Sequence, residues 1–321
     1  MKRLKLLSLV AVMLIFGMMA LGSGSGSEKK EIVASEDVSS VKEDDDSKTD
    51  ASSEAVDDAS MEASDEKADE ETGSSDVTIE EQVLFEENGL KVTATEYVSD
   101  SIWGDGIKML LENDGTEDVG LGCNALIVND YMITDLFSST IAAGKKANET
   151  LYLSSSGLKA AGIENVGKIE VYFHTFDPDT YMTINDFDCI TIQTSAYDEM
   201  DTVPNDAGQE LYNENGVKIV GKYVDENSFW GTAVLLYIEN NSGKNVIVQC
   251  DDMSINGFMV TPYFSSTVYD GKKAIDEITL MSSELEESGI DSVEDIELKF
   301  KLIDDNFMNS VESDVITFSA K

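Results

Sequence analysis

The sequence predicts an all-β protein built from two tandem β-sandwiches behind a disordered acidic segment. Three observations lead to this fold class. The chain repeats itself, since FSSTIAAGKKA at 137–147 recurs as FSSTVYDGKKA at 264–274. Apolar and polar residues alternate within each repeat, and this period of two is typical of strands with one buried face. The residues ahead of the repeats are mostly acidic or small.

The repeat covers a whole domain. Residues 87–173 and 214–300 align at a constant offset of 127, with 32 identities in 87 positions and no gap. The matched pieces include ENG, WG, EN, Cys123 with Cys250, and Asn129 with Asn256. A period this long indicates a duplicated domain of about 110 residues, because solenoid units repeat every 20–50 residues.

Each copy reads as a series of short strands. Ile169, Val171 and Phe173 form one apolar stripe, and Ile296, Leu298, Phe300 and Leu302 form its counterpart. NGLKV, ENDGTED, VNDYM and AAGKK supply turn residues, and INGFM contains an Asn-Gly pair suited to a type I′ hairpin. Further strands are expected at 90–98, 106–113, 118–128, 147–153 and 188–194, and short helical turns at Leu158–Ile163 and Leu285–Ile290.

About seven strands in a domain of this length favour an Ig-like sandwich of two packed sheets. The linker between the copies is polar and contains Pro204. The predicted organisation has a signal peptide at 1–22, a disordered acidic linker at 23–82, Ig-like domain 1 at 83–195, a linker at 196–209 and Ig-like domain 2 at 210–321.

The first residues carry a targeting signal. Lys2, Arg3 and Lys5 precede an apolar run from Leu6 to Leu21, and the pattern is that of a secretory signal peptide cut after Gly22. The run is shorter than the roughly 20 residues that span a bilayer, although retention as an anchor stays an alternative. Ser23 stands where a lipoprotein needs its lipobox Cys, so we expect an extracellular or loosely cell-surface-associated protein without a lipid anchor.

Acidic residues dominate the rest of the chain. Residues 28–82 hold 21 Asp or Glu against 5 Lys, a composition that predicts disorder because little apolar surface is available to bury. This segment is either a spacer or a solubilising tail. The formal net charge of the whole chain is −42, which excludes nucleic-acid binding, since that needs a basic surface. We also expect no membrane insertion after signal cleavage.

The chain resembles the tandem Ig-like domains of unknown function found in secreted proteins and lipoproteins of Gram-positive anaerobes, which relate to the fold of immunoprotective extracellular proteins. The resemblance covers residues 83–319 and is carried by ENG, the LxxEN segment near Leu110 and Leu236, VNxxM and the F-S-S-T…GKKA segment. The resemblance implies a β-sandwich in an extracellular setting of a Gram-positive bacterium, and it brings no catalytic residues to transfer.

The cysteines and the histidine are expected to be structural. Cys123 and Cys250 fall in phase with core residues, and Cys189 aligns with Val315, so we predict buried thiols, with a Cys123–Cys189 disulfide as the alternative. His174 lies on the polar face of its strand, which predicts a solvated side chain. The sequence contains no phosphate-binding loop, CxxC pair or GxSxG motif.

Metal and cofactor sites are not predicted. FDPDTYMTINDFD at 176–188 is rich in oxygen donors, as are Asp304–Asn306 with Glu312 and Asp314, yet neither segment has the spacing of an EF-hand loop. We interpret both as acidic solvated loops. Calcium binding at these loops is the alternative.

Six residues are weak candidates for ligand contact. Lys145 and Lys146, and likewise Lys272 and Lys273, follow a turn glycine and could receive an anionic group, or else keep a turn soluble. Trp103 and Trp230 precede a strand in each copy and are expected to plug the end of the sandwich; exposed, they would suit a sugar or peptide.

The sequence therefore predicts a secreted, non-enzymatic protein that acts as an extracellular binding or spacer module for a protein or glycan. The alternatives are a calcium-stabilised structural module and an extracellular hydrolase with a carboxylate site.

Overall fold

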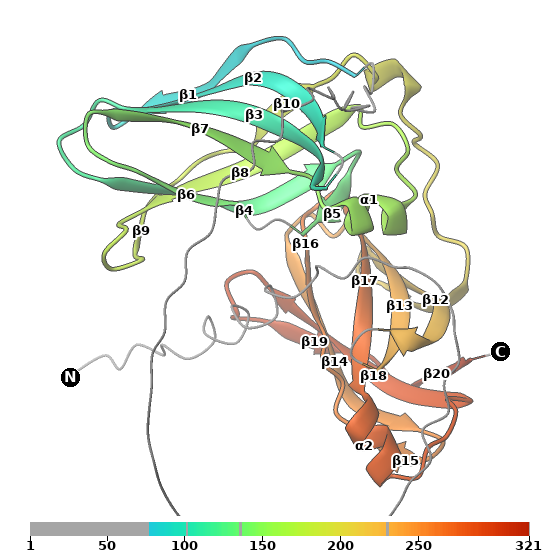
Figure 1. Cartoon of the computed structure of the whole chain (residues 1–321). Coiled ribbons are helices and arrows are strands. Elements are labelled where there is room, and N and C mark those ends of the chain that lie inside the picture. Colours follow the sequence, from blue (N-terminus) through green and yellow to red (C-terminus); the bar gives the residue numbers. More distant parts are fainter. Residues whose placement is uncertain (1–76, 101, 135–136, 229–230, 321) are drawn as a thin grey trace, which may run out of the picture. The chain divides into compact units, whose positions relative to one another are not determined.

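The computed structural model describes residues 77–320 except 101, 135–136 and 229–230, and these belong to one compact unit, Glu71–Lys321. It confirms the predicted fold class, because the described residues form two β-sandwiches with two short helices and one 3₁₀ turn (Figure 1). The predicted signal peptide and nearly all of the predicted acidic linker lie outside the described residues.

The first sandwich has two sheets. One sheet has the strand order β1-β2-β3-β7, and the other is built on β4, which pairs with β5, β6 and β8, while β8 pairs with β9 and β10. The elements are β1 (Gln82–Glu87), β2 (Leu90–Asp100), β3 (Gly104–Asn113), β4 (Val119–Val128), β5 (Tyr131–Ile133), β6 (Ser138–Ile141), β7 (Lys145–Tyr152), α1 (Ser155–Ala161), β8 (Lys168–Phe176), β9 (Thr183–Asp186), β10 (Ile190–Gln193) and η1 (Tyr197–Glu199).

The second sandwich repeats this order. Strands β11-β12-β13-β17 form one sheet, and β14 pairs with β15, β16 and β18 in the other, while β18 pairs with β19 and β20. The elements are β11 (Gln209–Glu214), β12 (Val217–Ser228), β13 (Gly231–Asn240), β14 (Val246–Ile255), β15 (Phe258–Met259), β16 (Ser265–Val268), β17 (Lys272–Met281), α2 (Ser282–Glu287), β18 (Asp295–Asp304), β19 (Ser310–Glu312) and β20 (Ile316–Ser319).

The alternating stripes predicted from the sequence face the cores. Ile169, Val171 and Phe173 on β8 are fully buried, and the stripe of Ile296, Leu298, Phe300 and Leu302 on β18 is buried in the second core. The Asn-Gly turn at 256–257 has positive φ at both residues, 50° and 84°, as the predicted type I′ hairpin requires. Period-two patterning and turn chemistry thus agree with the observed strands.

The helices begin three residues before the predicted turns. Ser154 caps α1, because its hydroxyl accepts a hydrogen bond from the Gly157 backbone N–H, and Gly162 ends the helix at φ 75°. The prediction began at the first apolar residue, Leu158, but the helix begins at the residue that follows its capping serine.

A buried asparagine closes one end of each sandwich. The Asn113 amide donates to the carbonyls of Glu117 and Ile141, both at 2.9 Å, and its oxygen accepts from the Gly115 N–H. Asn240 makes the same three bonds, to Lys244, Val268 and Ser242, and its side chain is fully buried. Each amide therefore joins the turn after one sheet to a strand of the other sheet.

A second asparagine in each sandwich fixes the next turn. Asn129 accepts from the N–H groups of Gly167 and Lys168, both at 3.0 Å, and donates to the Asn165 carbonyl. Asn256 makes the matching bonds to Ser292, Glu294 and Asp295. Both residues have positive φ, near 50°, a conformation that asparagine tolerates better than most residues. The turn after β4 or β14 is thereby held to the start of β8 or β18.

The two sandwiches share a continuous sheet. Strands β5 and β17 pair in parallel, with Tyr131 opposite Lys273 and Met132 opposite Ala274. The sheet order is β10-β8-β4-β5-β17-β13-β12-β11, so one sheet of the first sandwich continues into one sheet of the second.

Replacing Asn240 by Ala should lower the free energy of unfolding of the second sandwich by roughly 3 kcal/mol, because three backbone groups lose their partner and the bond to Val268 among them is buried. Asn241→Ala is the matched control, since Asn241 is the exposed neighbour in the same turn. Thermal and denaturant unfolding measure both variants. Equal stability of the two variants would show that the buried amide is dispensable.

Asp276 should make stability depend on pH. Burial raises the pKa of this carboxyl to about 6, against a smaller opposing effect of hydrogen bonds from the Glu277 N–H and the Ser266 hydroxyl. The unfolded value is 3.8, so the folded state binds the proton more tightly and stability rises as the pH falls through 6. Above pH 6 the ionised group carries its full penalty.

We therefore expect Asp276→Asn to stabilise the protein at pH 7 by up to about 3 kcal/mol, the free-energy equivalent of that shift in pKa. The gain should shrink below pH 6 and vanish near pH 4. Melting temperatures between pH 4 and 8 test this, with the exposed Asp291→Asn as control for the loss of one charge. A gain that is constant with pH would contradict the assignment.

Candidate functional site

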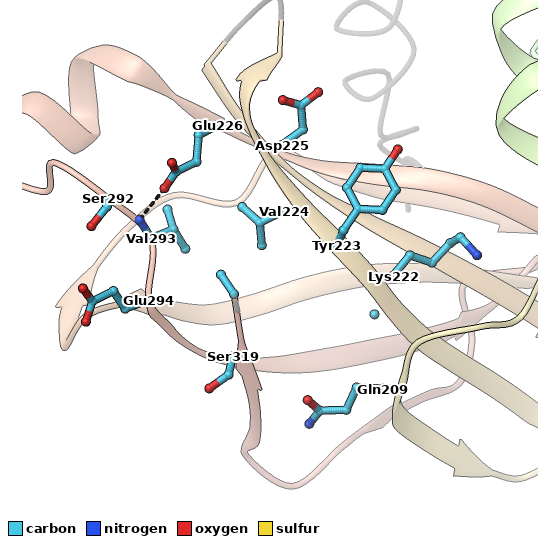
Figure 2. A pocket seen from close by; sticks show the side chains of 12 residues that line it. Gln209, Lys222, Tyr223, Val224, Asp225, Glu226, Ser292, Val293, Glu294 and Ser319 are labelled. Carbon is cyan, nitrogen blue, oxygen red and sulfur yellow. Dashed lines mark hydrogen bonds between the residues drawn. The ribbon is translucent and has the colours of Figure 1, made fainter.

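A groove opens at one edge of the second sandwich, between its two sheets (Figure 2). Its volume is about 800 Å³, within the range of roughly 300–1,000 Å³ that is typical of ligand pockets. One wall is Gln209 of β11 with Gly221–Glu226 of β12. The other wall is Ser292–Glu294, which leads into β18, with Ser319 and Ala320 at the end of β20.

The groove is open because the chain ahead of β11 turns away from it. Pairing of β11 with β12 begins at Gln209 opposite Gly221. Before that point, Asn205 contacts the first sandwich, where its N–H donates to the Tyr131 hydroxyl at 2.9 Å and its amide donates to the Ala160 carbonyl at 3.3 Å. Gly208 permits this path, because a side chain there would collide with the Gly221 carbonyl oxygen.

The first sandwich closes the same place with its own chain. Ile79 forms an antiparallel bridge with Thr194, and the Ser195 N–H donates to the Thr78 carbonyl at 2.8 Å. Val77 and Ile79 pack against the first core. The residues ahead of β1 thus fill the edge that the residues ahead of β11 leave open.

The residues after β10 add a second cover on the first sandwich. Ala196 is buried, and Met200 lies against Gly167, where an added Cβ would come within 2.8 Å of the Met200 Cβ. The position that matches Gly167 is Glu294, which lines the groove. A glycine accommodates the covering chain in one sandwich, whereas a carboxylate stands there in the other.

The groove combines an apolar floor with an acidic rim. Val224 packs against the second core and Val293 is buried. The carboxylates come from Asp225, Glu226 and Glu294, and Glu226 also accepts a hydrogen bond from the Val293 N–H at 2.8 Å (Figure 2).

The Lys222 ammonium is hydrogen-bonded to the segment ahead of β11. Burial lowers the pKa of its ammonium group, partly opposed by Asp206. The same ammonium donates to the Asn205 carbonyl at 2.7 Å and to the Ala207 carbonyl at 3.3 Å. Its charge is therefore directed toward the segment ahead of β11, and the groove remains suited to a cationic ligand.

Of the six residues that the sequence offered as ligand contacts, the five that the structure describes do not line the groove. Lys145 is exposed, and Lys146 forms an ion pair with Glu112, which raises the pKa of Lys146 through their hydrogen bond and charge. The sequence reasoning missed the groove, although one signal was available. VTIEEQ at 77–82 aligns with PNDAGQ at 204–209, so the apolar residues that close the first sandwich have no counterpart in the second.

The side chains of Lys272 and Lys273 contact residues of the first sandwich. The Lys272 ammonium lies 3.0 Å from Asp130 and 2.6 Å from Glu170, and Lys168 contacts the same two carboxylates. Burial alone would raise the pKa of Asp130, but the hydrogen bonds and charges of the two lysines lower it. The Lys273 ammonium lies over the Tyr131 ring, 5.4 Å from its centroid.

The expectation that Trp103 plugs the sandwich is wrong, since 54% of its surface is exposed. The Asp100 carboxylate accepts hydrogen bonds from the N–H groups of Ile102 and Trp103, and this turn holds the indole outside the core, 6.0 Å from the Tyr152 ring. Trp230 lies outside the described residues.

The cysteines follow the prediction in part. Cys250 is buried, whereas Cys123 is half-buried next to a bulge in β4, where the register with β8 shifts between Cys123 and Ala125. Cys189 is exposed, which contradicts the expected burial, because it precedes β10 outside the paired segment. It is a free thiol, so the alternative disulfide with Cys123 does not form.

His174 is half-buried rather than solvated. Its ring covers Gly122 on the neighbouring strand, and a Cβ there would lie 2.6 Å from the imidazole. Burial lowers the pKa of His174, with Asp186 opposing in part, and the buried Nδ1 has no hydrogen-bond partner. Because Gly122 has no side chain, the imidazole of His174 can pack against the sheet at this position.

The acidic segments act as turns. The Asp177 carboxylate accepts from the N–H groups of Asp179 and Thr180, at 2.9 and 3.1 Å. Across residues 77–320, outside the short gaps, no three Asp, Glu, His or Cys side chains gather as metal ligands. In the same part of the chain, no helix has the length and apolar character to cross a membrane.

Lys272→Ala should lower the free energy of unfolding by about 2 kcal/mol, because two half-buried carboxylates would then share only Lys168. Lys145→Ala is the matched control, since Lys145 occupies the equivalent position in the first sandwich and is exposed; its effect should stay within about 0.5 kcal/mol. Denaturant titration of both variants measures the difference. Equal effects would mean that the cluster does not stabilise the contact.

Comparison with protein-family models finds no match, and comparison with curated proteins finds none either. Among solved structures, the YadV chaperone is 12% identical with a TM-score of 0.22, covering 66% of this chain and 92% of that one. The Salmonella enterica SafA pilin in complex with the SafB chaperone is 12% identical with a TM-score of 0.20, and the match covers 67% of this chain and 88% of that one. A protein of unknown function from Porphyromonas gingivalis W83 is 10% identical with a TM-score of 0.19, and the match covers 67% of this chain and 90% of that one. Scores this low carry no conclusion about family or activity.

Proposed function

We propose that this protein is a secreted, non-enzymatic binding module that holds a partner in the groove of its second sandwich. The observation that carries the proposal is the difference between the two sandwiches. Chain segments close the edge of the first, while the matching edge of the second is an open groove of about 800 Å³. A place that the fold fills in one copy and leaves open in the other suits a ligand.

The contact between the sandwiches supports a presenting role. The parallel pairing of β5 with β17 and the four-residue charge cluster of Asp130, Lys168, Glu170 and Lys272 join them. The path of Asn205 toward Tyr131, which keeps the groove open, depends on the same contact. The first sandwich therefore acts as a support that sets the form of the binding sandwich.

The predicted secretory leader and the acidic composition support an extracellular partner that is not strongly anionic. A chain exported from a Gram-positive cell meets extracellular proteins and glycans, and a net charge of −42 disfavours nucleic acids and anionic surfaces. The alternative of a calcium-stabilised module gains no support from the described residues, in which no group of three His, Cys, Asp or Glu side chains could hold a metal ion.

The test compares the full chain with a Ser319→Trp variant, in which a bulky ring occupies the groove. Both are screened against displayed random hexapeptides and an array of bacterial and host glycans. We expect ligands that the wild-type chain retains and the variant loses. Ser283→Trp, on exposed helix α2, is the control and should bind as the wild type does. Ligands that bind all three proteins alike, or no ligand at all, would overturn the proposal.

A further inference from the structure

We propose that the ligand of the groove is an extended peptide that pairs antiparallel with the end of β20, carrying β-branched apolar residues followed by Lys or Arg. This inference rests on the proposed function and names the ligand class for the same site. It follows from three features of the described residues: a free backbone edge, an apolar floor and an acidic rim.

The backbone edge is the first feature. In the first sandwich, the Thr194 N–H donates to the Gly167 carbonyl on one side, and the residue pair Thr78–Ile79 lies along its other side. In the second, the Ala320 N–H donates to the Glu294 carbonyl at 3.0 Å, which is the same bond at the matching position. The opposite edge at Ser319 and Ala320 faces the groove, where a peptide strand can take the place that Thr78 and Ile79 hold.

The apolar floor sets the side chains of the peptide. Val77 and Ile79 alternate with Thr78, and both apolar side chains pack on the first core. The matching residues Pro204 and Asp206 carry no such side chain to the second core. A peptide with the pattern Val-Thr-Ile would bury its two branched residues over Val224 and Val293.

The acidic rim sets the charge of the peptide. Asp225, Glu226 and Glu294 line the groove, and the equivalent of Glu294 in the first sandwich is the uncharged Gly167. The native strand that fills the first sandwich continues with Glu80 and Glu81, which would be repelled here. Lysines at those two positions would instead be attracted, and the acidic leader of this chain is disfavoured as the occupant.

The experiment uses three synthetic hexapeptides and fluorescence anisotropy with the full chain. VTIKKQ carries the proposed features, and VTIEEQ reverses the charge. The third peptide is VTIKKQ methylated on the backbone nitrogen of its fourth residue, which removes the N–H that a strand bridged as Ile79 is to Thr194 directs at β20. We expect VTIKKQ to bind at least tenfold more tightly than either of the other two. Glu294→Lys should weaken VTIKKQ binding at least fivefold, while Glu287→Lys, the same change on exposed α2, should leave it unchanged.

The outcomes separate this inference from the proposed function. Equal binding of VTIKKQ and its N-methylated form would overturn the strand pairing, and equal binding of VTIKKQ and VTIEEQ would overturn the charge preference. If VTIKKQ fails while library ligands or glycans still depend on an open groove, the peptide assignment falls and the binding function stands. If no ligand distinguishes Ser319→Trp from the wild type, both fall.

Discussion

Four asparagine amides carry the geometry of both sandwiches, and three of them, Asn113, Asn129 and Asn240, are buried. An asparagine that is cut off from water must satisfy its own donors and acceptor, so its position fixes every backbone group that it bonds. Asn113 and Asn240 join the turn after β3 or β13 to the opposite sheet, and Asn129 and Asn256 join the next turn to the start of β8 or β18. The apolar stripes supply burial energy, but these amides determine how the two sheets are registered on each other.

The repeated segment that ends in GKKA shows how one sequence serves two purposes. In the first sandwich, Lys145 is exposed and Lys146 pairs with Glu112. In the second, Lys272 enters a charge cluster with residues of the first sandwich, and Lys273 covers Tyr131. The duplicated residues kept their chemistry while their partners changed. Lys146, Lys272 and Lys273 therefore have structural contacts in the described residues, and groups of this chain take the place of the predicted ligand.

The sequence was sufficient for whatever depends on local pattern. Alternation located the β8 and β18 stripes, Asn-Gly pairs located hairpins, and the offset of 127 located the matched elements. It was insufficient where tertiary contacts decide. Trp103 is held outside by the Asp100 turn, and His174 lies on Gly122, both through contacts that a single strand pattern does not encode. The groove was not predicted because it arises from an absence: the apolar residues Val77 and Ile79 of the first sandwich have no apolar counterpart in the second. Motifs and candidate site residues do not reveal such a difference.

The linker at 196–209 contacts both sandwiches. Its early part covers the first, where Ala196 is buried and Met200 lies on Gly167. Its late part joins the two, since Asn205 bonds Tyr131 of the first and Lys222 of the second. Of the two matching edges, that of the second sandwich stays open as a groove in the described residues, while that of the first is filled. A chain that binds through this groove as proposed would be monovalent despite its doubled architecture, so strong adhesion to a repetitive surface would have to come from many chains acting side by side.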